Sequence, residues 1–374
     1  MPEARNWACS KRIVCNIMKR KLPIEQLSRN DNFGGLRIIA ALMVLLGHSY
    51  ILTGSKLAIP SLFYIGIHTF GLVVFFCISG YLICGSVLRS SGRGYALKRI
   101  FRIYPAYSLV VIIWVFFFGA VFSSEGASQY FQDPAKWTYL RNLLFFPVFY
   151  LPGVFTSTPV PNAVNGSLWS LPIEIVCYAI VGTLFLLIFR RNLRWFKVGI
   201  LFVLAICVAY YLNNFGQTTP DNPETVIWGT GLINSAYLIV FFFVGVLLRL
   251  IKPNRIRLDY AVISVGILLI FPYGSDIYTL LQWVLIPYIV IAFGLSATPA
   301  LVKVQRFGDP SLGIYLWAYP IQQACWQLFG PHLDFFSNLF LVTILSCTFG
   351  YLSWHLVEKR FIGKLNKFEN SQRS

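Results

Sequence analysis

An arginine and a histidine lie in the first strongly apolar stretch of the chain. Arg37 stands near its start, His48 follows eleven residues later, and the residues between them are all apolar or small. In an α-helix this spacing brings two side chains to within about 20° of one face and separates them by about 16 Å along the axis. Polar side chains inside a membrane-spanning helix are costly, so both are candidates for function. We therefore expect Arg37 and His48 to face one channel at different depths.

Such a pair suits a long anionic substrate that enters from the Arg37 end. Arginine can hold a phosphorylated head by charge, and imidazole can act as a general base because it exchanges protons near neutral pH. Acyl-coenzyme A has this shape, with Arg37 as the anchor and His48 as the base. Helix geometry alone leaves two alternatives open. His48 could be a structural histidine bonded to a backbone carbonyl, and Arg37 an ordinary charged helix end.

Membrane-spanning helices must position these residues. Hydrophobic residues make up 57% of the 374 positions, charged residues only 12%, and the mean hydropathy is +0.66. Whole windows of about twenty residues are nearly free of charge, which is typical of spanning helices. We predict an all-α polytopic bundle of about ten transmembrane helices. The predicted spans cover residues 36–53, 66–88, 102–122, 168–189, 196–213, 229–249, 258–272, 277–298, 310–329 and 336–357.

The positive charges predict how the bundle is oriented. The formal net charge is +17, but the 31 lysines and arginines cluster between apolar windows, so we expect no nucleic-acid partner. If both termini are cytoplasmic, 28 of these residues lie on the cytoplasmic side, as the positive-inside rule requires. We expect a basic cytoplasmic arm at 1–33, one membrane domain at 34–357 and a basic cytoplasmic tail at 358–374.

Two further expectations concern the cysteines and the longest external segment. The spacing of the eight cysteines predicts neither a disulfide framework nor a metal site, and most of them read as small apolar fillers. The external segment at about 123–167 contains an apolar stretch, Leu143 to Val154, that prolines interrupt and that is too short to span. We expect it to be a re-entrant or interfacial element that lines a cavity.

A series of motifs resembles acyltransferase family 3 over residues 33–357. In chain order they are Leu36-Arg37 with His48, Phe75-Phe76-Cys77-Ile78-Ser79-Gly80-Tyr81-Leu82-Ile83, Arg99-Ile100-Phe101-Arg102-Ile103-Tyr104-Pro105, Asn165-Gly166-Ser167-Leu168-Trp169-Ser170-Leu171-Pro172-Ile173-Glu174, and Gly313-Ile314-Tyr315-Leu316-Trp317. The sequence departs from the family pattern at Gly71–Val74, where many members have an acidic residue, and at Ala318, where many have histidine. Those two positions are therefore not expected to be catalytic here.

The resemblance implies a multi-pass O-acyltransferase of the bacterial inner membrane. It would move an acyl group, usually acetyl, from cytoplasmic acyl-coenzyme A to a hydroxyl of an extracytoplasmic or lipid-linked glycan. The acceptor would be lipopolysaccharide O-antigen, exopolysaccharide or a related polymer, and acetyl-coenzyme A would be a co-substrate with no permanently bound cofactor. Direct transfer and a relay through acylated His48 stay open, as does the oligomeric state.

The resemblance also assigns residues. Arg37 and His48 match the family's arginine and histidine pair, and Arg99 and Arg102 match its Arg-x-x-Arg motif. Arginines three apart share a helix face and could grip one phosphate, although plain positive-inside anchoring is the alternative. Ser79, beside Gly80, would flank the thioester, or these small residues would serve only helix packing.

The remaining block would serve the acceptor side. Ser167, Trp169, Ser170 and Glu174 match the family's Ser-Leu-Trp-Ser-x-x-x-Glu pattern. Glu174 would orient His48 or bond the acceptor sugar, the alternative being a helix cap or an interhelical hydrogen bond. The rival function is a transporter or flippase for a glycan or acyl carrier. Inverted repeats would support it, and the sequence shows none. A structural membrane subunit is a third possibility.

Overall fold

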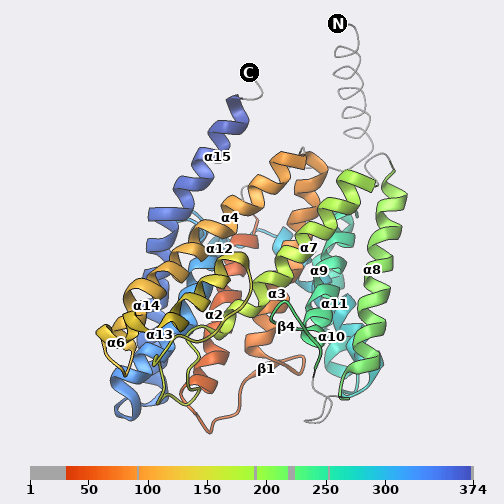
Figure 1. Ribbon diagram of the computed structural model, residues 1–374. Coiled ribbons are helices and arrows are strands. Elements are labelled where there is room, and N and C mark those ends of the chain that lie inside the picture. The colour runs from red at the N-terminus through yellow and green to blue at the C-terminus, as the bar shows by residue number, and fades with distance from the viewer. Residues whose placement is uncertain (1–30, 91, 189–191, 218–223, 252, 372–374) are drawn as a thin grey trace, which may run out of the picture.

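The structure, a computed structural model, describes residues 31–90, 92–188, 192–217, 224–251 and 253–371. Helices form one bundle in which most long axes run in roughly the same direction (Figure 1). The long helices are α2 (Phe33–Leu52), α3 (Ile67–Arg89), α4 (Gly92–Ile113), α7 (Ser170–Thr183), α8 (Leu193–Asn214), α9 (Leu232–Arg249), α10 (Leu258–Ile270), α11 (Asp276–Leu295), α13 (Ser311–Phe329), α14 (Phe335–Ser353) and α15 (Lys359–Ser371). The predicted arm at 1–33 lies almost wholly outside the described residues.

Short elements connect these helices. They include α5 (Gly119–Phe122), α6 (Ala127–Gln132), α12 (Pro299–Gln305), 3-10 helices η2 (Pro134–Leu144), η3 (Gly166–Trp169), η5 (Pro253–Arg255) and η6 (Gly330–His332), and π-helical turns η1 (Trp114–Phe118), η4 (Leu184–Ile188) and η7 (Trp354–Glu358). Strand β1 (Ser61–Leu62) pairs antiparallel with β2 (Ile65–Gly66), and β3 (Val226–Ile227) pairs with β4 (Thr230–Gly231). Each hairpin leads directly into a long helix, α3 or α9.

Eight stretches of the described chain are long and apolar enough to cross a membrane. They are Phe33–Leu52, Ile67–Arg89, Gly92–Phe122, Gly166–Leu186, Leu193–Asn214, Leu232–Arg249, Asp276–Leu295 and Phe335–Leu365. The all-α, membrane-spanning class is thereby confirmed. Each of the ten predicted ranges contains a helix, but α10 has only 13 residues and α13 is less apolar because it carries Gln322, Gln323 and Gln327. Ten spans therefore stay a prediction.

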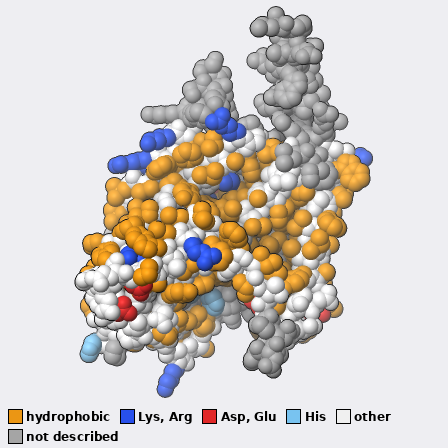
Figure 2. Space-filling model, viewed as in Figure 1, with side chains coloured by type: hydrophobic (Ala, Val, Ile, Leu, Met, Phe, Trp, Pro, Cys, Tyr) orange, Lys and Arg blue, Asp and Glu red, His pale blue; other side chains and the backbone are white. Residues whose placement is uncertain are grey.

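The outer face of the bundle is apolar, as a lipid-facing surface requires. Hydrophobic side chains are spread over much of the face seen in Figure 2. Several of them stand far out of the protein, such as Ile270, which is 84% exposed, and Phe202, which is 66% exposed. Water would make such exposure unfavourable, whereas lipid tails solvate these side chains. The surface thus agrees with a multi-pass membrane protein.

Helix α3 is the most enclosed part of the bundle and packs between α2 and α9. Its contact with α9 brings the two backbones together, because a Cβ on Gly80 would overlap the carbonyl group of Phe242. Small residues allow this approach in membrane helices, where close packing replaces the hydrophobic effect as the source of association. Ser79, next to Gly80, is therefore held by a backbone that has little freedom to shift.

The segment predicted to be external, at 123–167, folds back into the bundle through its apolar side chains. After η2 ends at Leu144, residues 145–154 form no helix, yet Val148, Leu151 and Val154 are buried. The Asn142 amide donates to the Val148 carbonyl at 2.9 Å and its oxygen accepts from the Val148 N–H at 3.0 Å, which pairs backbone groups that no helix satisfies. The depth of this stretch in the membrane stays a prediction.

One side chain that precedes α7 binds a backbone carbonyl of α13 that has no partner within the helix. Pro320 lacks an N–H, so the Leu316 carbonyl one turn earlier has no helical partner. The Asn165 amide donates to this carbonyl at 2.9 Å, and the Asn165 oxygen accepts from the Ser167 N–H at 3.2 Å at the start of η3. Asn165 is fully buried and so fixes the entry to α7 against α13.

Replacing Asn165 with alanine is expected to destabilise the protein by about 1–3 kcal/mol, because the Leu316 carbonyl would be left buried without a partner. Thermal unfolding of the purified protein in detergent would measure the change. Asn213→Ala is the matched control, since the Asn213 amide also donates to a backbone carbonyl, that of Ala209 at 2.8 Å, but in an exposed place. Equal melting temperatures for the two variants would contradict the role of Asn165.

The orientation in the membrane is also testable. Tyr150 is 61% exposed in the external segment, and Lys303 is exposed on α12. In a background without other cysteines, we expect a membrane-impermeant maleimide added to spheroplasts to label cysteine at position 150 and not at position 303. The loop predicted at 214–224 is less suited to this test, because residues 218–223 lie outside the described residues. Labelling of position 303 alone would reverse the predicted topology.

Candidate functional site

A cavity of about 500 Å³ lies between α2, α3, α4, α7, α13 and α15. It begins near the basic end of the bundle, by which we mean the end where α3 meets α4 and where α15 starts. It ends at Leu72, Phe75, Ser170 and Tyr315, which we call its inner end. Five basic side chains line it, namely Arg37, Arg89, Lys98, Arg99 and Arg102, together with two acidic ones, Glu174 and Asp309. The cavity therefore carries an excess of positive charge.

Two of the predicted arginines share one carboxylate. An oxygen of Asp309 lies 2.8 Å from Arg37 and 2.6 Å from Arg102, and the Ser311 hydroxyl donates to its second oxygen at 2.6 Å. We call Arg37, Asp309 and Arg102 the arginine clasp; it joins α2, α4 and the segment before α13. Arg102 also lies 3.9 Å from Glu358. Burial raises the pKa of Asp309, but Arg102, Arg37 and the bonds from Ser311 outweigh it and hold this pKa at about 2, so Asp309 stays ionised.

The other predicted arginine of the Arg-x-x-Arg motif points elsewhere. The Arg99 guanidinium lies 5.9 Å from the centre of the Tyr178 ring. Its buried Nε has no hydrogen-bond partner among the described residues, and the same is true of Arg37 Nε. Lys98 donates to the Ser90 hydroxyl at 3.2 Å at the rim of the cavity. Arg99 and Arg102 thus line one cavity but do not converge on one point.

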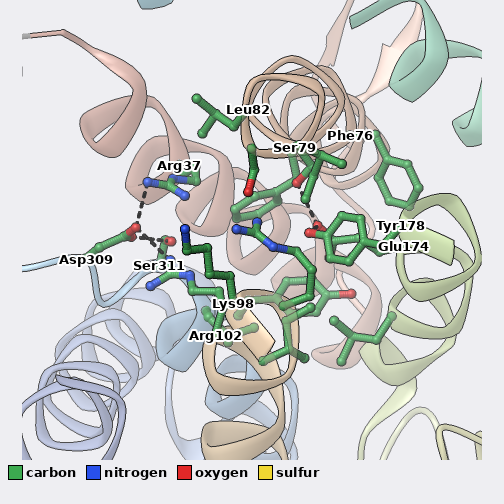
Figure 3. Close-up of a pocket in the computed structure, with 18 of the residues that line it drawn as sticks. Arg37, Phe76, Ser79, Leu82, Lys98, Arg102, Glu174, Tyr178, Asp309 and Ser311 are labelled. Carbon is green, nitrogen blue, oxygen red and sulfur yellow. Dashed lines mark hydrogen bonds and ion pairs between the residues drawn. The ribbon is translucent and has the colours of Figure 1, made fainter. Parts of the chain in front are cut away.

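Glu174 lies on the wall opposite the clasp (Figure 3). The Ser79 hydroxyl donates to Glu174 Oε1 at 2.6 Å, and the Tyr178 hydroxyl donates to the same oxygen. This brings together two predicted residues, Ser79 of α3 and Glu174 of α7. Glu174 makes no hydrogen bond with His48 among the described residues, and the interhelical hydrogen bond considered from the sequence is the one it forms with Ser79.

The start of α7 forms the inner end of the cavity. Ser170 is hydrogen-bonded to the Tyr315 hydroxyl at 2.6 Å, and Tyr315 donates to the Ser167 carbonyl. The Ser167 side chain is buried, and its hydroxyl has no partner in the described part of the chain. Trp169 is only half-buried and is not among the residues that line the cavity. Of the predicted acceptor block, Ser170 and Glu174 therefore reach the cavity directly.

His48 lies beyond the inner end of the cavity and does not line it. Its Nδ1 is 3.0 Å from the Val44 carbonyl, which assigns the proton to Nδ1 and leaves the lone pair on Nε2. Its ring contacts Tyr319 edge-on, with centroids 5.3 Å apart. Tyr319 follows Tyr315 by one helical turn on α13, or about 6 Å. Helix geometry left open that His48 is a structural histidine bonded to a backbone carbonyl, and the bond to Val44 is such a bond. The same bond also fixes the tautomer that a general base needs.

Several residues of this region were not predicted from the sequence. Asp309 stands in the short loop between α12 and α13, and only the fold brings it to Arg37 and Arg102. Tyr178 could have been suspected, because it lies one turn after Glu174 on the same helix face. Tyr315 belongs to a recognised motif but was given no role. His68, the neighbour of His48 in space, had no sequence signal beyond its place in an apolar stretch.

The chain is similar in sequence to several known proteins. A family model described as an acyltransferase domain matches residues 30–355. An O-acetyl transferase of Shigella phage Sf6 is 29% identical over 346 residues, which cover 90% of this chain and 97% of the phage protein. The peptidoglycan O-acetyltransferase OatA of Listeria monocytogenes is 27% identical over 290 residues, 67% of this chain but only 44% of the Listeria protein. Nodulation protein 10 of Rhizobium leguminosarum is 27% identical over 213 residues, 52% of this chain and 54% of that protein. No solved structure matches significantly.

Proposed function

Since this chain belongs to acyltransferase family 3, we propose that it transfers an acetyl group from cytoplasmic acyl-coenzyme A to a hydroxyl of a surface polysaccharide. The acceptor is lipopolysaccharide O-antigen, exopolysaccharide or a lipid-linked precursor of either, and the protein resides in the bacterial inner membrane. The transporter interpretation is set aside, because the family and two of the named relatives, those of phage Sf6 and Listeria monocytogenes, are acyltransferases.

The charge of the cavity is the observation that supports this donor. Five basic side chains face only two carboxylates there, and the buried Nε atoms of Arg37 and Arg99 have no partners among the described residues. Guanidinium groups with unused donors suit phosphate oxygens, which accept several charge-assisted hydrogen bonds. The phosphates of acyl-coenzyme A fit this part of the cavity, and its arm can extend past Ser79 and Glu174 towards the inner end.

His48 supplies the base at the far side of that inner end. With Nδ1–H bonded to Val44, the free Nε2 takes the proton of the acceptor hydroxyl. The hydroxyl oxygen forms a bond to the acetyl carbon, the carbon–sulfur bond breaks, and coenzyme A leaves as a thiolate toward the basic end. Tyr315 and Tyr319 stand between the cavity and His48, so the acetyl group must pass beside these two rings.

Mass spectrometry of the surface polysaccharide tests the proposed function. Cells that contain the protein should carry one more acetyl group per modified repeat than cells that lack it. Purified protein should also move labelled acetyl from acetyl-coenzyme A to polysaccharide extracted from cells that lack the protein. Identical polysaccharides in both cell types, together with no transfer in vitro, would refute the proposal.

Replacing Glu174 with glutamine is expected to slow transfer about tenfold while the affinity for acetyl-coenzyme A changes little. The amide oxygen can still accept from Ser79 and Tyr178, so the shape of the wall persists and only the charge beside the reacting arm is lost. Calorimetric titration and a transfer assay would separate the two effects. Glu125→Gln, at an exposed site of the external segment, is the control. An equal loss of donor binding would indicate that Glu174 only shapes the bundle.

A further inference from the structure

A second histidine lies beside His48, at the end of the bundle opposite the basic end. His68 is in the first turn of α3, and its ring centroid is 5.7 Å from that of His48, with the ring planes tilted by 46°. Both side chains are partly exposed. Polar side chains placed together within membrane helices are costly and are a functional hypothesis by default. No step of the proposed transfer described so far uses His68.

Two glycines make room for this pair. A Cβ on Gly47 would lie 2.6 Å from His68 Cβ and 2.7 Å from its backbone nitrogen, closer than packed atoms approach. A Cβ on Gly66 would lie 3.1 Å from His68 Cε1. Any side chain at position 47 would push the first turn of α3 away from α2. The close approach of the two imidazoles is therefore built into the helix contact.

The ring nitrogens divide into bonded, buried and available ones. His48 uses Nδ1 for the Val44 carbonyl and keeps the lone pair on Nε2. His68 Nδ1 is buried, lies near Gly66 and has no partner in the described part of the protein. Nε2 is therefore the His68 nitrogen that can reach a ligand. If Nε2 carries the proton, His68 presents a donor next to the acceptor nitrogen of His48.

On the basis of the proposed function, we infer that His68 binds the acceptor sugar and delivers its hydroxyl to His48. The hydroxyl oxygen accepts a hydrogen bond from His68 Nε2–H and donates its own proton to His48 Nε2. Two hydrogen bonds of about 2.8 Å each can bridge rings at this separation. When the oxygen attacks the acetyl carbon, its proton passes to His48 and the bond from His68 holds the oxygen in place. His68 is thus an acceptor-binding residue for a glycan hydroxyl.

Two substitutions at position 68 test which nitrogen is used. His68→Gln places an amide N–H near the position of Nε2, whereas His68→Asn places it near Nδ1. The probe is unmodified polysaccharide extracted from cells that lack the protein, with labelled acetyl-coenzyme A as donor. We expect His68→Asn to raise the half-saturating polysaccharide concentration at least tenfold, and His68→Gln to stay within about threefold of the parent. Donor affinity, measured by calorimetry, should stay within twofold for both.

The outcomes separate this inference from the proposed function. If the parent protein transfers acetyl to the polysaccharide but His68→Asn is as active at low polysaccharide concentration, the inference about His68 fails and the proposed function stands. Loss of donor binding in either variant, or equal loss of polysaccharide affinity in both, would also overturn it. If the parent itself does not transfer, the proposed function fails. His355→Asn, at an exposed histidine of η7, controls for the substitution itself.

Discussion

Replacing His48 with alanine is expected to lower the rate of acetyl transfer about a hundredfold or more, while the protein still folds and binds acetyl-coenzyme A. The substitution removes Nε2, the only base in the proposed reaction. It does not touch the cavity, which ends before His48. Transfer of labelled acetyl would measure the rate, and calorimetric titration the donor affinity.

The control for this variant is His332→Ala, because His332 is exposed on η6 and does not line the cavity. It should transfer acetyl at the parent rate. If His48→Ala did so as well, the catalytic assignment would be wrong and the bond to the Val44 carbonyl would be the whole role of His48. If His48→Ala lost donor binding too, the imidazole would belong to the donor site.

The second large effect is expected at Arg99. Replacing it with alanine should weaken the binding of acetyl-coenzyme A about tenfold to a hundredfold, the range for one lost charge-assisted contact of about 1.5–3 kcal/mol. No ion pair to a carboxylate engages Arg99 among the described residues, so its guanidinium is available to phosphate. Arg37→Ala should weaken the binding of acetyl-coenzyme A less, because Asp309 already pairs with Arg37 and because Arg99 and Arg102 remain.

Calorimetric titration of the two variants would rank these arginines. Arg257→Ala is the matched control, since Arg257 pairs with Asp259 on an exposed surface and does not line the cavity. It should bind the donor as the parent does. A larger loss for Arg37→Ala than for Arg99→Ala would contradict the expected order. It would mean that the donor phosphates replace Asp309 in the arginine clasp.

Much of the fold follows from apolar patterning, but helix ends do not. The predicted span at 36–53 and α2 at Phe33–Leu52 nearly coincide, because the apolar stretch and the helix end together. By contrast, α4 begins at Gly92, ten residues before the start of the predicted span at 102. The helical chain that starts with α14 continues through η7 and α15 to Ser371, well past the predicted end at 357. Hydropathy detects only the apolar residues that can lie in lipid. Arginine and lysine have high helix propensity, so a helix can continue through them beyond the membrane.

The candidate site, like the fold, could be predicted from the sequence only in part. Local spacing places Arg37 and His48 on one helix face, but it cannot reveal that Leu72, Phe75 and Tyr315 close the cavity before it reaches His48. Asp309 is 207 positions from Arg102, and no local signal joins residues so far apart. Of the residues that motif recognition assigned, those that line the cavity are Arg37, Ser79, Arg99, Arg102, Ser170 and Glu174. Their partners depend on how separate helices pack, which a single sequence does not state.

The tight contact at Gly80 has a consequence for surveys of sequence variants. Every other residue at position 80 would force α3 and α9 apart, so such variants would lose activity through low abundance in the membrane. Ser79 is the adjacent position, yet its hydroxyl is bonded to Glu174 in the cavity, and removing it would lower turnover in protein that still accumulates. In a saturation library scored only by growth or by surface antigen, the two neighbours would look alike. Only a score that divides activity by the amount of inserted protein would tell them apart.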